Sequence, residues 1–336
     1  MKDEIKPRTS ISFAPHLAGY EWRAVGLEDV SAIRALTAAA AEVDGTGAAA
    51  TEGSLAQILG MLGERVESDT LAAVTVGGTI AAAAFVFFSP AENEHLAMME
   101  GIVDMNHRGR GLGNAILNWM EGRVEEEFGR YDDDLPLQMR MSCADHQADR
   151  IVLFEAHGFK KARYAYEMQR NMELSIPEKP LPAGLRLVTW TKENDADLMQ
   201  AFNAAFKENW GLSRVNEELW NNLFTGVPQF RSDLTYLALD GSEVAGFCLN
   251  WVDEAKNEQT GIQEGWIEAV GVVPEWRGRG LGSALMVQSL NDFAALGFMR
   301  AALDVDTENP TGALQLYEKL GFEAVKRTIV FLKDEG

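Results

Sequence analysis

Several residue types are scarce in this 336-residue sequence, and each scarcity excludes a class of protein. Two cysteines, Cys143 and Cys248, are too few for a disulfide framework or a cysteine metal site, so no metal is expected and a reducing compartment fits. Residues 1–6 lack the apolar segment of a secretory signal. We therefore expect a cytoplasmic protein.

Basic charge and long apolar runs are scarce as well. The formal net charge is −21 and the isoelectric point is near 4.7, which excludes the basic surface that nucleic-acid binding needs. Such a charge keeps a protein soluble, and it also attracts cationic ligands such as amines. The most apolar stretch, residues 71–88, is interrupted by Gly77 and Gly78 and is rich in Ala and Thr. We expect a hairpin there and no membrane partner.

What the sequence does have is an internal repeat. Arg-Gly-Arg-Gly-Leu-Gly occurs at residues 108–113 and again at residues 277–282. Each copy follows an apolar stretch, precedes an amphipathic helical pattern and is followed by a Gly-Phe pair, at 158–159 and at 321–322. A motif repeated with its surroundings indicates two related domains.

The repeat sets the expected domain boundaries. Residues 175–184 are rich in proline, which suits neither a helix nor a central strand, so we interpret this segment as a linker. The N-terminal domain is then expected over residues 18–174 and the C-terminal domain over residues 185–335.

Both halves show the same order of expected elements. A strand and a helix come first, and then two β-rich runs that meet at Gly77-Gly78 in one half and at Asp240-Gly241 in the other, both typical hairpin turns. A third strand enters the repeated motif, at residues 97–104 and 266–273, and a helix, a strand and a short helix follow. This order predicts an α/β fold with a mixed sheet in each domain.

The repeated motif is typical of a phosphate-binding turn. Glycines at alternate positions let several backbone N–H groups point into one concavity, and the helix that follows adds its own unpaired N–H groups. The arginines supply positive charge at the rim. The motif lacks the Gly-Lys-Ser/Thr of a Walker A loop, and its glycine spacing and position differ from those of a Rossmann fingerprint. A pyrophosphate is the expected ligand.

The residues around the second copy resemble a known family. Residues 272–285, Val-Val-Pro-Glu-Trp-Arg-Gly-Arg-Gly-Leu-Gly-Ser-Ala-Leu, resemble the acetyl-CoA signature of the GNAT N-acetyltransferase superfamily, and residues 309–322 resemble its closing motif. The resemblance covers nearly all of residues 183–335. The tandem arrangement is similar to that of mycothiol synthase-like, two-domain GNAT proteins. It implies acetyl-CoA as co-substrate and direct transfer of acetyl to the amine of a small molecule.

The resemblance also implies roles for individual residues. Tyr317 would be the acid that protonates the departing thiolate, although a packing role is the alternative. Glu268 would be the base, with Glu264 as a substitute on the same strand face and a plain surface carboxylate as the alternative. A turn or N-cap role is the alternative for Asn309. The residues expected to contact the cofactor are Val270, Val272, Arg277, Gly278, Arg279, Gly280, Gly282, Ser283 and Asn309, with Arg108, Gly109, Arg110, Gly111 and Gly113 in the first copy.

The first copy departs from the family pattern. Aligning its Gly-Phe pair with the second puts Phe154 at the position of Tyr317 and His146 at that of Asn309, while Met99, next to Glu100, replaces the base. Phenylalanine cannot donate a proton, so we expect the C-terminal domain to be catalytic. Acetylation of aminoglycosides or other drugs, and a non-catalytic acetyl-CoA-binding module, are alternative functions. The sequence leaves a monomer and a homodimer equally open.

Overall fold

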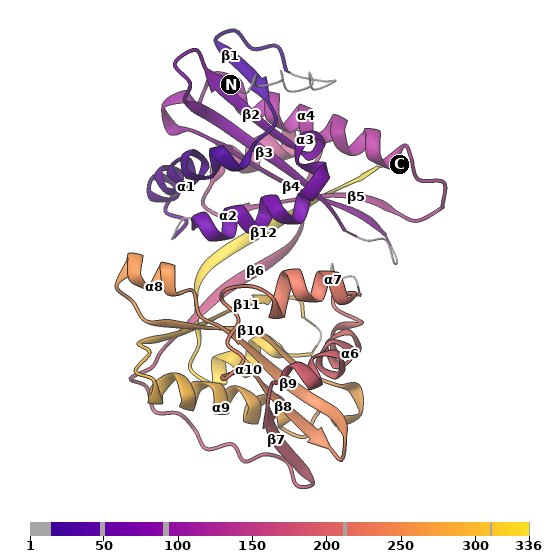
Figure 1. The fold of residues 1–336 in the computed structure, drawn as a ribbon, viewed down its shortest axis with the longest axis vertical. Coiled ribbons are helices and arrows are strands. Elements are labelled where there is room, and N and C mark those ends of the chain that lie inside the picture. Colours follow the sequence, from indigo (N-terminus) through magenta and orange to yellow (C-terminus); the bar gives the residue numbers. More distant parts are fainter. Residues whose placement is uncertain (1–14, 48–50, 90–93, 211–213, 310, 336) are drawn as a thin grey trace, which may run out of the picture. The chain divides into compact units, whose positions relative to one another are not determined.

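The computed structural model describes residues 15–47, 51–89, 94–210, 214–309 and 311–335 (Figure 1). The chain forms two compact units: unit 1 contains Met1–Ala162 and Ile329–Gly336, and unit 2 contains Arg163–Thr328. Each unit holds one copy of the repeated motif. Both are built of helices around a mixed sheet, which confirms the predicted α/β class.

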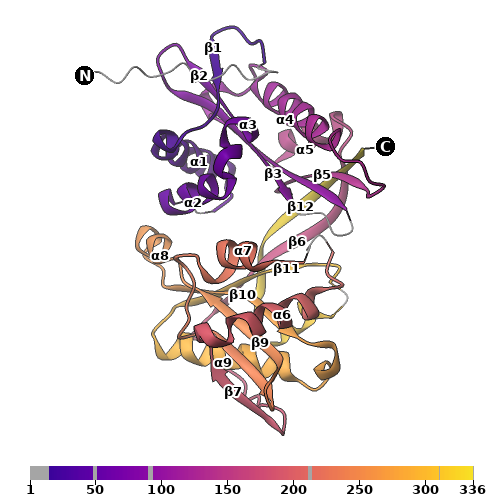
Figure 2. The same ribbon diagram turned by 45° about the vertical axis from the view of Figure 1, so that its right-hand side comes forward.

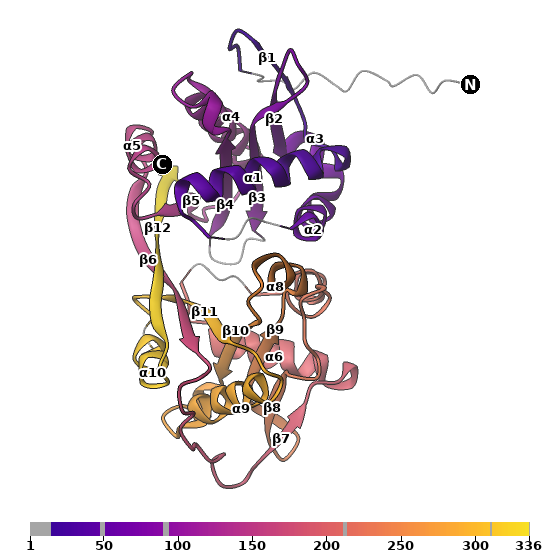
Figure 3. The ribbon, with the colours of Figure 1, turned by 90° about the vertical axis from the view of Figure 1, so that its left-hand side faces the viewer.

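Unit 1 has the strand order β1-β2-β3-β4-β5-β12, in which only β4 and β5 of the pairs from β1 to β5 run parallel. Its sheet carries α1 on one face and α4 on the other (Figure 3). Because both faces are covered, the interiors of β2 and β3 are apolar, and most of the stretch 71–88 forms these two strands. The elements are β1 (Tyr20–Arg23), α1 (Val30–Asp44), α2 (Glu52–Leu62), α3 (Val66–Asp69), β2 (Thr70–Thr75), β3 (Ile80–Ser89), β4 (His95–Val103), α4 (Leu112–Phe128), β5 (Leu137–Ala144) and α5 (Ala148–Ala156).

Unit 2 repeats this plan with the strand order β6-β11-β10-β9-β8-β7. Helices α9 and α6 belong to two different apolar cores, one on each face of the sheet, and both helices can be followed in Figure 2. One core contains Leu285 and Phe293 of α9, and the other contains Phe202 of α6. The elements are β6 (Lys160–Asn171), β7 (Leu185–Thr189), α6 (Asp195–Phe206), α7 (Glu217–Trp220), β8 (Tyr236–Asp240), β9 (Glu243–Trp251), α8 (Glu254–Thr260), β10 (Glu264–Val272), α9 (Leu281–Ala295), β11 (Arg300–Asp306), α10 (Ala313–Lys319) and β12 (Glu323–Glu335).

The two compact units differ from the two sequence repeats because the repeats exchange their last strands. Most of β6, from the first repeat, pairs with β11 in unit 2, and the end of β12, from the second repeat, lies in unit 1. There Phe331 is fully buried, with its ring 5.3 Å from that of Phe154. Residues 175–184, which the structure describes throughout, form neither helix nor strand and lie within unit 2. The units therefore do not divide the chain at 175–184, where the sequence places a linker.

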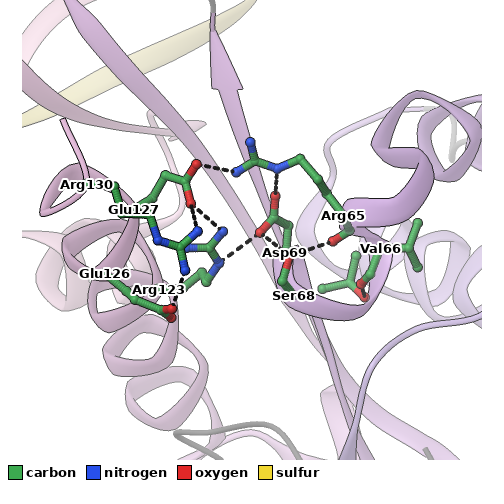
Figure 4. Close-up of polar contacts among 9 residues, drawn as sticks. Arg65, Val66, Ser68, Asp69, Arg123, Glu126, Glu127 and Arg130 are labelled. Carbon is green, nitrogen blue, oxygen red and sulfur yellow. Dashed lines mark hydrogen bonds and ion pairs between the residues drawn. The ribbon is translucent and has the colours of Figure 1, made fainter. Parts of the chain in front are cut away.

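A buried ion network holds α3 against α4 in unit 1 (Figure 4). Asp69 is fully buried and accepts hydrogen bonds from Arg65 Nε at 2.6 Å and Arg123 Nε at 2.8 Å. Glu127 accepts from Arg123 Nη2 at 2.8 Å and from Arg130 Nη1 at 3.0 Å. Arg65 Nη2 also lies 3.2 Å from Glu127 Oε1, so Asp69 faces two guanidinium groups and Glu127 faces three. The network fixes the helix that follows the repeated motif.

Across the part of the chain that the structure describes, no helix combines the length and the apolar character needed to cross a membrane.

Candidate active site

The two copies of the glycine motif adopt the same backbone conformation. Gly278 and Gly280 have φ of 73° and 80°, and Gly109 and Gly111 have φ of 72° and 88°. These left-handed values favour glycine. Gly280 and Gly111 are the N-cap residues of α9 and α4, so each turn delivers the chain into a helix whose first N–H groups have no partner within the helix. Both turns therefore present an anion-binding helix start.

The first arginine of each motif anchors the turn. Arg277 donates from Nε to the Val272 carbonyl at 3.2 Å and from Nη2 to the Ala205 carbonyl, at the end of α6, at 2.9 Å. In unit 1, both terminal nitrogens of Arg108 donate to the carboxylate of Asp44, at 2.6 and 2.8 Å. The sequence predicts these side chains at the rim of the phosphate site. In the structure these two side chains contact neighbouring helices and strands.

The other residues that the sequence predicts at the cofactor site also have contacts within the protein. The Arg279 guanidinium carbon lies 4.5 Å from the centre of the Trp276 ring. Asn309 Oδ1 accepts from the backbone N–H of Thr311 at 2.9 Å, which is the turn role that the sequence left as an alternative. A Cβ on Gly282 would lie 3.6 Å from Val272 Cγ2, so a small residue here lets α9 approach β10. Ser283 follows in the first turn of that helix. In unit 1, Gly113 of α4 matches Gly282, and Arg110, which matches Arg279, lies in the turn before α4.

Strand β10 has an open edge beside the turn. Its parallel pairing with β11 covers residues 264–266, yet β10 continues to Val272. Val270 and Val272 lie in this stretch and pair on the other side with β9. In a strand, alternate residues direct their N–H and C=O groups to opposite edges. The stretch therefore presents hydrogen-bonding groups to an extended ligand whose phosphate end reaches the turn.

A β-bulge displaces Glu268 at the start of this open edge. The pairing of β10 with β9 shifts register between Ile267 and Ala269, which leaves Glu268 as the extra residue. Burial, together with the nearby charge of Asp304, raises the pKa of Glu268 to about 7, and a hydrogen bond from Trp266 opposes this. A carboxyl group that titrates near neutral pH is suited to accept a proton.

Glu264, on the same strand as Glu268, is held by ion pairs. Its side chain is buried and forms ion pairs with Lys256 Nζ at 2.7 Å and Arg300 Nη1 at 3.4 Å. Its backbone is held by the side chain of Asn257. Both carboxylate oxygens of Glu264 are thus engaged by cations. The contacts therefore favour Glu268 over Glu264 as the base.

Tyr317 belongs to the apolar cluster that includes Val270 and Val272. The residue is 8% exposed, and burial raises the pKa of its phenol well above the ordinary value, with a smaller contribution from Cys248. The described residues form no hydrogen bond to its hydroxyl group. The hydroxyl is therefore protonated at neutral pH and free to donate to a ligand.

The matching positions in unit 1 lack these groups. Phe154 is buried and packs against the rings of Phe159 and Phe331, and Met99 is buried too. His146 Nε2 lies 2.6 Å from the carbonyl oxygen of Asp44, so this ring contacts the end of α1. Unit 1 keeps the turn but has neither the phenol nor the carboxyl group of unit 2 at these positions.

Sequence reasoning missed Asp304, whose charge acts on Glu268, and Glu167, whose charge acts on Asp304. Asp304 of β11 lies opposite Glu167 of β6, and burial together with the charge of Glu167 raises the pKa of Asp304 to about 6. The available signal was the alternation of apolar and acidic residues in Leu303-Asp304-Val305-Asp306, which places both aspartates on one face. Which strands flank β11 depends on the strand exchange, and the sequence does not show this.

Comparison with known proteins agrees with this geometry. The family model described as acetyltransferase (GNAT) family matches residues 196–322. A mycothiol acetyltransferase of Geodermatophilus obscurus is 30% identical over 302 residues, which cover 87% of this chain and 90% of the relative. Among solved structures, a GCN5-related N-acetyltransferase from Sphaerobacter thermophilus has a TM-score of 0.76 at 24% identity and covers 95% of this chain and 97% of its own.

The tandem arrangement also has a structural counterpart. A tandem GNAT protein from the clavulanic acid biosynthesis pathway has a TM-score of 0.66 at 15% identity, covering 94% of this chain and 99% of its own. At this identity the likeness concerns the fold alone. Together with the glycine turn, the open strand edge and the relatives, it supports the two-domain interpretation of the repeat. The chain is therefore an N-acetyltransferase that belongs to the GNAT family.

Proposed function

We propose that the chain transfers acetyl from acetyl-CoA to the amine of a small molecule, with the active site in unit 2. Two observations carry the proposal: Glu268 lies at the start of the open edge of β10, and Tyr317 belongs to the apolar cluster against which Val270 and Val272 of that strand pack. Glu268 has a carboxyl group with a pKa near neutrality, and Tyr317 has a protonated phenol with no hydrogen-bond partner among the described residues. Val270 and Val272 belong to the part of β10 that does not pair with β11, and Gly278, Gly280 and Gly282 shape the phosphate turn.

The residues divide the reaction into proton removal, attack and proton return. Glu268, acting through a water molecule, removes a proton from the acceptor ammonium, because a protonated amine cannot attack a carbonyl group. The free amine forms the new C–N bond while the C–S bond to CoA breaks, and backbone N–H groups of β10 stabilise the developing oxyanion. The Tyr317 hydroxyl gives its proton to the departing thiolate, which is then released as the thiol. The nitrogen, positively charged once the C–N bond has formed, loses its second proton to solvent as the amide is released. Solvent returns a proton to Tyr317 and takes up the proton held by Glu268, so one proton is released for each acetyl group transferred.

The acceptor belongs to a cationic class. An ammonium is attracted by the carboxylates of Glu268, Asp304 and Glu167 and by the net charge of −21. The name of the relatives makes a mycothiol-type amine the first acceptor to assay, and aminoglycosides, which are also cationic amines, are the second.

The proposal is tested by measuring CoA release with a panel of amines: the mycothiol-type acceptor, aminoglycosides, polyamines and peptides. Saturable release with one class, accompanied by an acetylated product in mass spectra, supports an acetyltransferase and names its acceptor. Acetyl-CoA binding without turnover on any amine in the panel would favour the acetyl-CoA-binding module over the enzyme.

A further inference from the structure

Unit 1 also contains an open strand edge beside its glycine turn. The parallel pairing of β4 with β5 covers residues 95–98 of β4, while that strand continues to Val103. Gly101 lies in the stretch of β4 that does not pair with β5, as Val270 lies in the stretch of β10 that does not pair with β11. In both units, two parallel strands stop pairing beside the glycine turn. The side chains that lie between the two strands differ.

In unit 1 an arginine lies between β4 and β5 where they no longer pair. Arg150 of α5 donates from Nη2 to the carbonyl oxygen of Gly101 at 2.9 Å, and its guanidinium carbon lies 5.7 Å from the centre of the Phe154 ring. Burial lowers the pKa of Arg150, while the nearby Cys143 and Glu100 oppose this. Cys143 is on β5 and Glu100 on β4, so the guanidinium lies between the two strands after their pairing has ended.

A second set of contacts joins the ends of the separated strands. The carboxylate of Asp44 accepts from Arg108, which follows β4, at 2.6 and 2.8 Å. The same carboxylate accepts from Gln147 Nε2, which follows β5, at 3.1 Å. One side chain at the end of α1 thereby ties together the two segments between which an extended ligand would enter.

Unit 2 lacks the arginine. Aligning the two Gly-Phe pairs places Ala313 at the position of Arg150, and an alanine side chain cannot reach across the strands. The same alignment places Tyr317 at the position of Phe154. The two changes occur on one helix: where unit 1 has an arginine and a phenylalanine, unit 2 has an alanine and a phenol.

We propose that Arg150 closes the space between β4 and β5 in unit 1, so that each chain binds one acetyl-CoA, in unit 2. The hydrogen bond to Gly101 uses a carbonyl group that an amide N–H of an extended ligand would otherwise engage, and the guanidinium fills the space that the ligand's chain would occupy. The open glycine turn of unit 1 is then insufficient for binding. This inference rests on the proposed function, because it assumes that unit 2 binds acetyl-CoA.

The test is the number of acetyl-CoA molecules bound per full-length chain, measured by isothermal titration calorimetry. We expect one site in the wild-type protein and two in Arg150→Ala. Arg150→Met, which keeps an apolar stem against Phe154 and removes the hydrogen bond, is a second variant in case the alanine variant is poorly folded. Arg130→Ala, which removes an exposed arginine of the same unit, is the matched control and should leave one site.

Combined variants locate each site. Gly280→Val should abolish binding in the wild-type background, whereas Arg150→Ala with Gly280→Val should retain the one site in unit 1, and adding Gly111→Val should abolish it. Two sites in the wild-type protein, or one site in both folded Arg150 variants, would overturn the inference while leaving the proposed function intact. No binding by the wild-type protein would overturn the proposed function itself and this inference with it.

Discussion

At the residue scale, the chemistry depends on the hydroxyl group that distinguishes Tyr317 from Phe154. Replacing Tyr317 with Phe removes the acid but keeps the ring in its apolar cluster, so we expect kcat to fall by about two to four orders of magnitude. The dissociation constant of acetyl-CoA should remain nearly unchanged in calorimetry. Undiminished CoA release by the variant would show that Tyr317 only packs.

Glu268 predicts how activity depends on pH. The base must be ionised, and the pKa of Glu268 is about 7, so kcat/KM should rise as pH increases through that value. The negative charge of Asp304 contributes to the raised pKa, and Asp304→Asn should therefore move this rise to lower pH. Asp134→Asn, at an exposed site in unit 1, is the charge-matched control. If Asp304→Asn does not shift the rise of kcat/KM with pH, Glu268 is not the base. The same follows if Glu268→Gln keeps that rise.

The sequence predicts these residues unevenly, for a physical reason. The glycines at 278 and 280 and the position of Tyr317 are readable because local backbone conformation and a fixed motif determine them. The choice between Glu264 and Glu268 is not readable, because strand periodicity places both on one face. The carboxylate of Glu264 forms ion pairs with Lys256 and Arg300, which lie on other elements. A bulge in the pairing of β10 with β9 displaces Glu268.

At the scale of elements, the α3–α4 network predicts a large stability effect from one substitution. Asp69→Asn removes a charged partner of the buried Arg123 guanidinium and of the partly exposed Arg65, and breaking a buried pair costs about 3–5 kcal/mol. Glu126→Gln, in an exposed pair with Arg130, should cost no more than about 1 kcal/mol. Urea unfolding followed by circular dichroism measures both, and equal effects would mean that burial does not strengthen the network.

The strand exchange leads to a prediction about the chain terminus. Removing residues 329–336 deletes Phe331, whose ring packs on Phe154, and Lys333, which pairs with Glu121 at 2.7 Å. These contacts belong to unit 1, so we expect hydrogen exchange to accelerate in β5 and α5 far more than in β9 and β10. Removing residues 1–14 serves as the truncation control. Faster exchange confined to unit 2 would contradict the exchange of strands.

The sequence predicts the elements better than their partners. The hairpins, the strands that enter the turns and the helices that follow are all found, because periodicity and turn residues are local signals. The helix α2 was not anticipated, although Leu55, Leu59 and Leu62 bury one of its faces. Which sheet receives β6 or β12 is a long-range choice, and a linker rich in proline is equally compatible with exchanged and unexchanged strands.

At the scale of the whole molecule, two units of one fold are proposed to have unequal chemistry. Valine at Gly280 or at Gly111 would force a side chain into a left-handed backbone, where the positions have φ of 80° and 88°. The strain is therefore similar at the two sites. Its consequence for catalysis should differ, because only unit 2 pairs its turn with the phenol and the displaced glutamate.

We therefore expect Gly280→Val to abolish CoA release and Gly111→Val to retain most of it, in one assay with equal amounts of folded protein. Some loss in the second variant is expected through stability, since a strained glycine position costs about 1–3 kcal/mol. Thermal melting of both variants separates that loss from an effect on chemistry. If Gly111→Val is inactive while Gly280→Val turns over normally, the active site lies in unit 1, and Tyr317 and Glu268 have other roles.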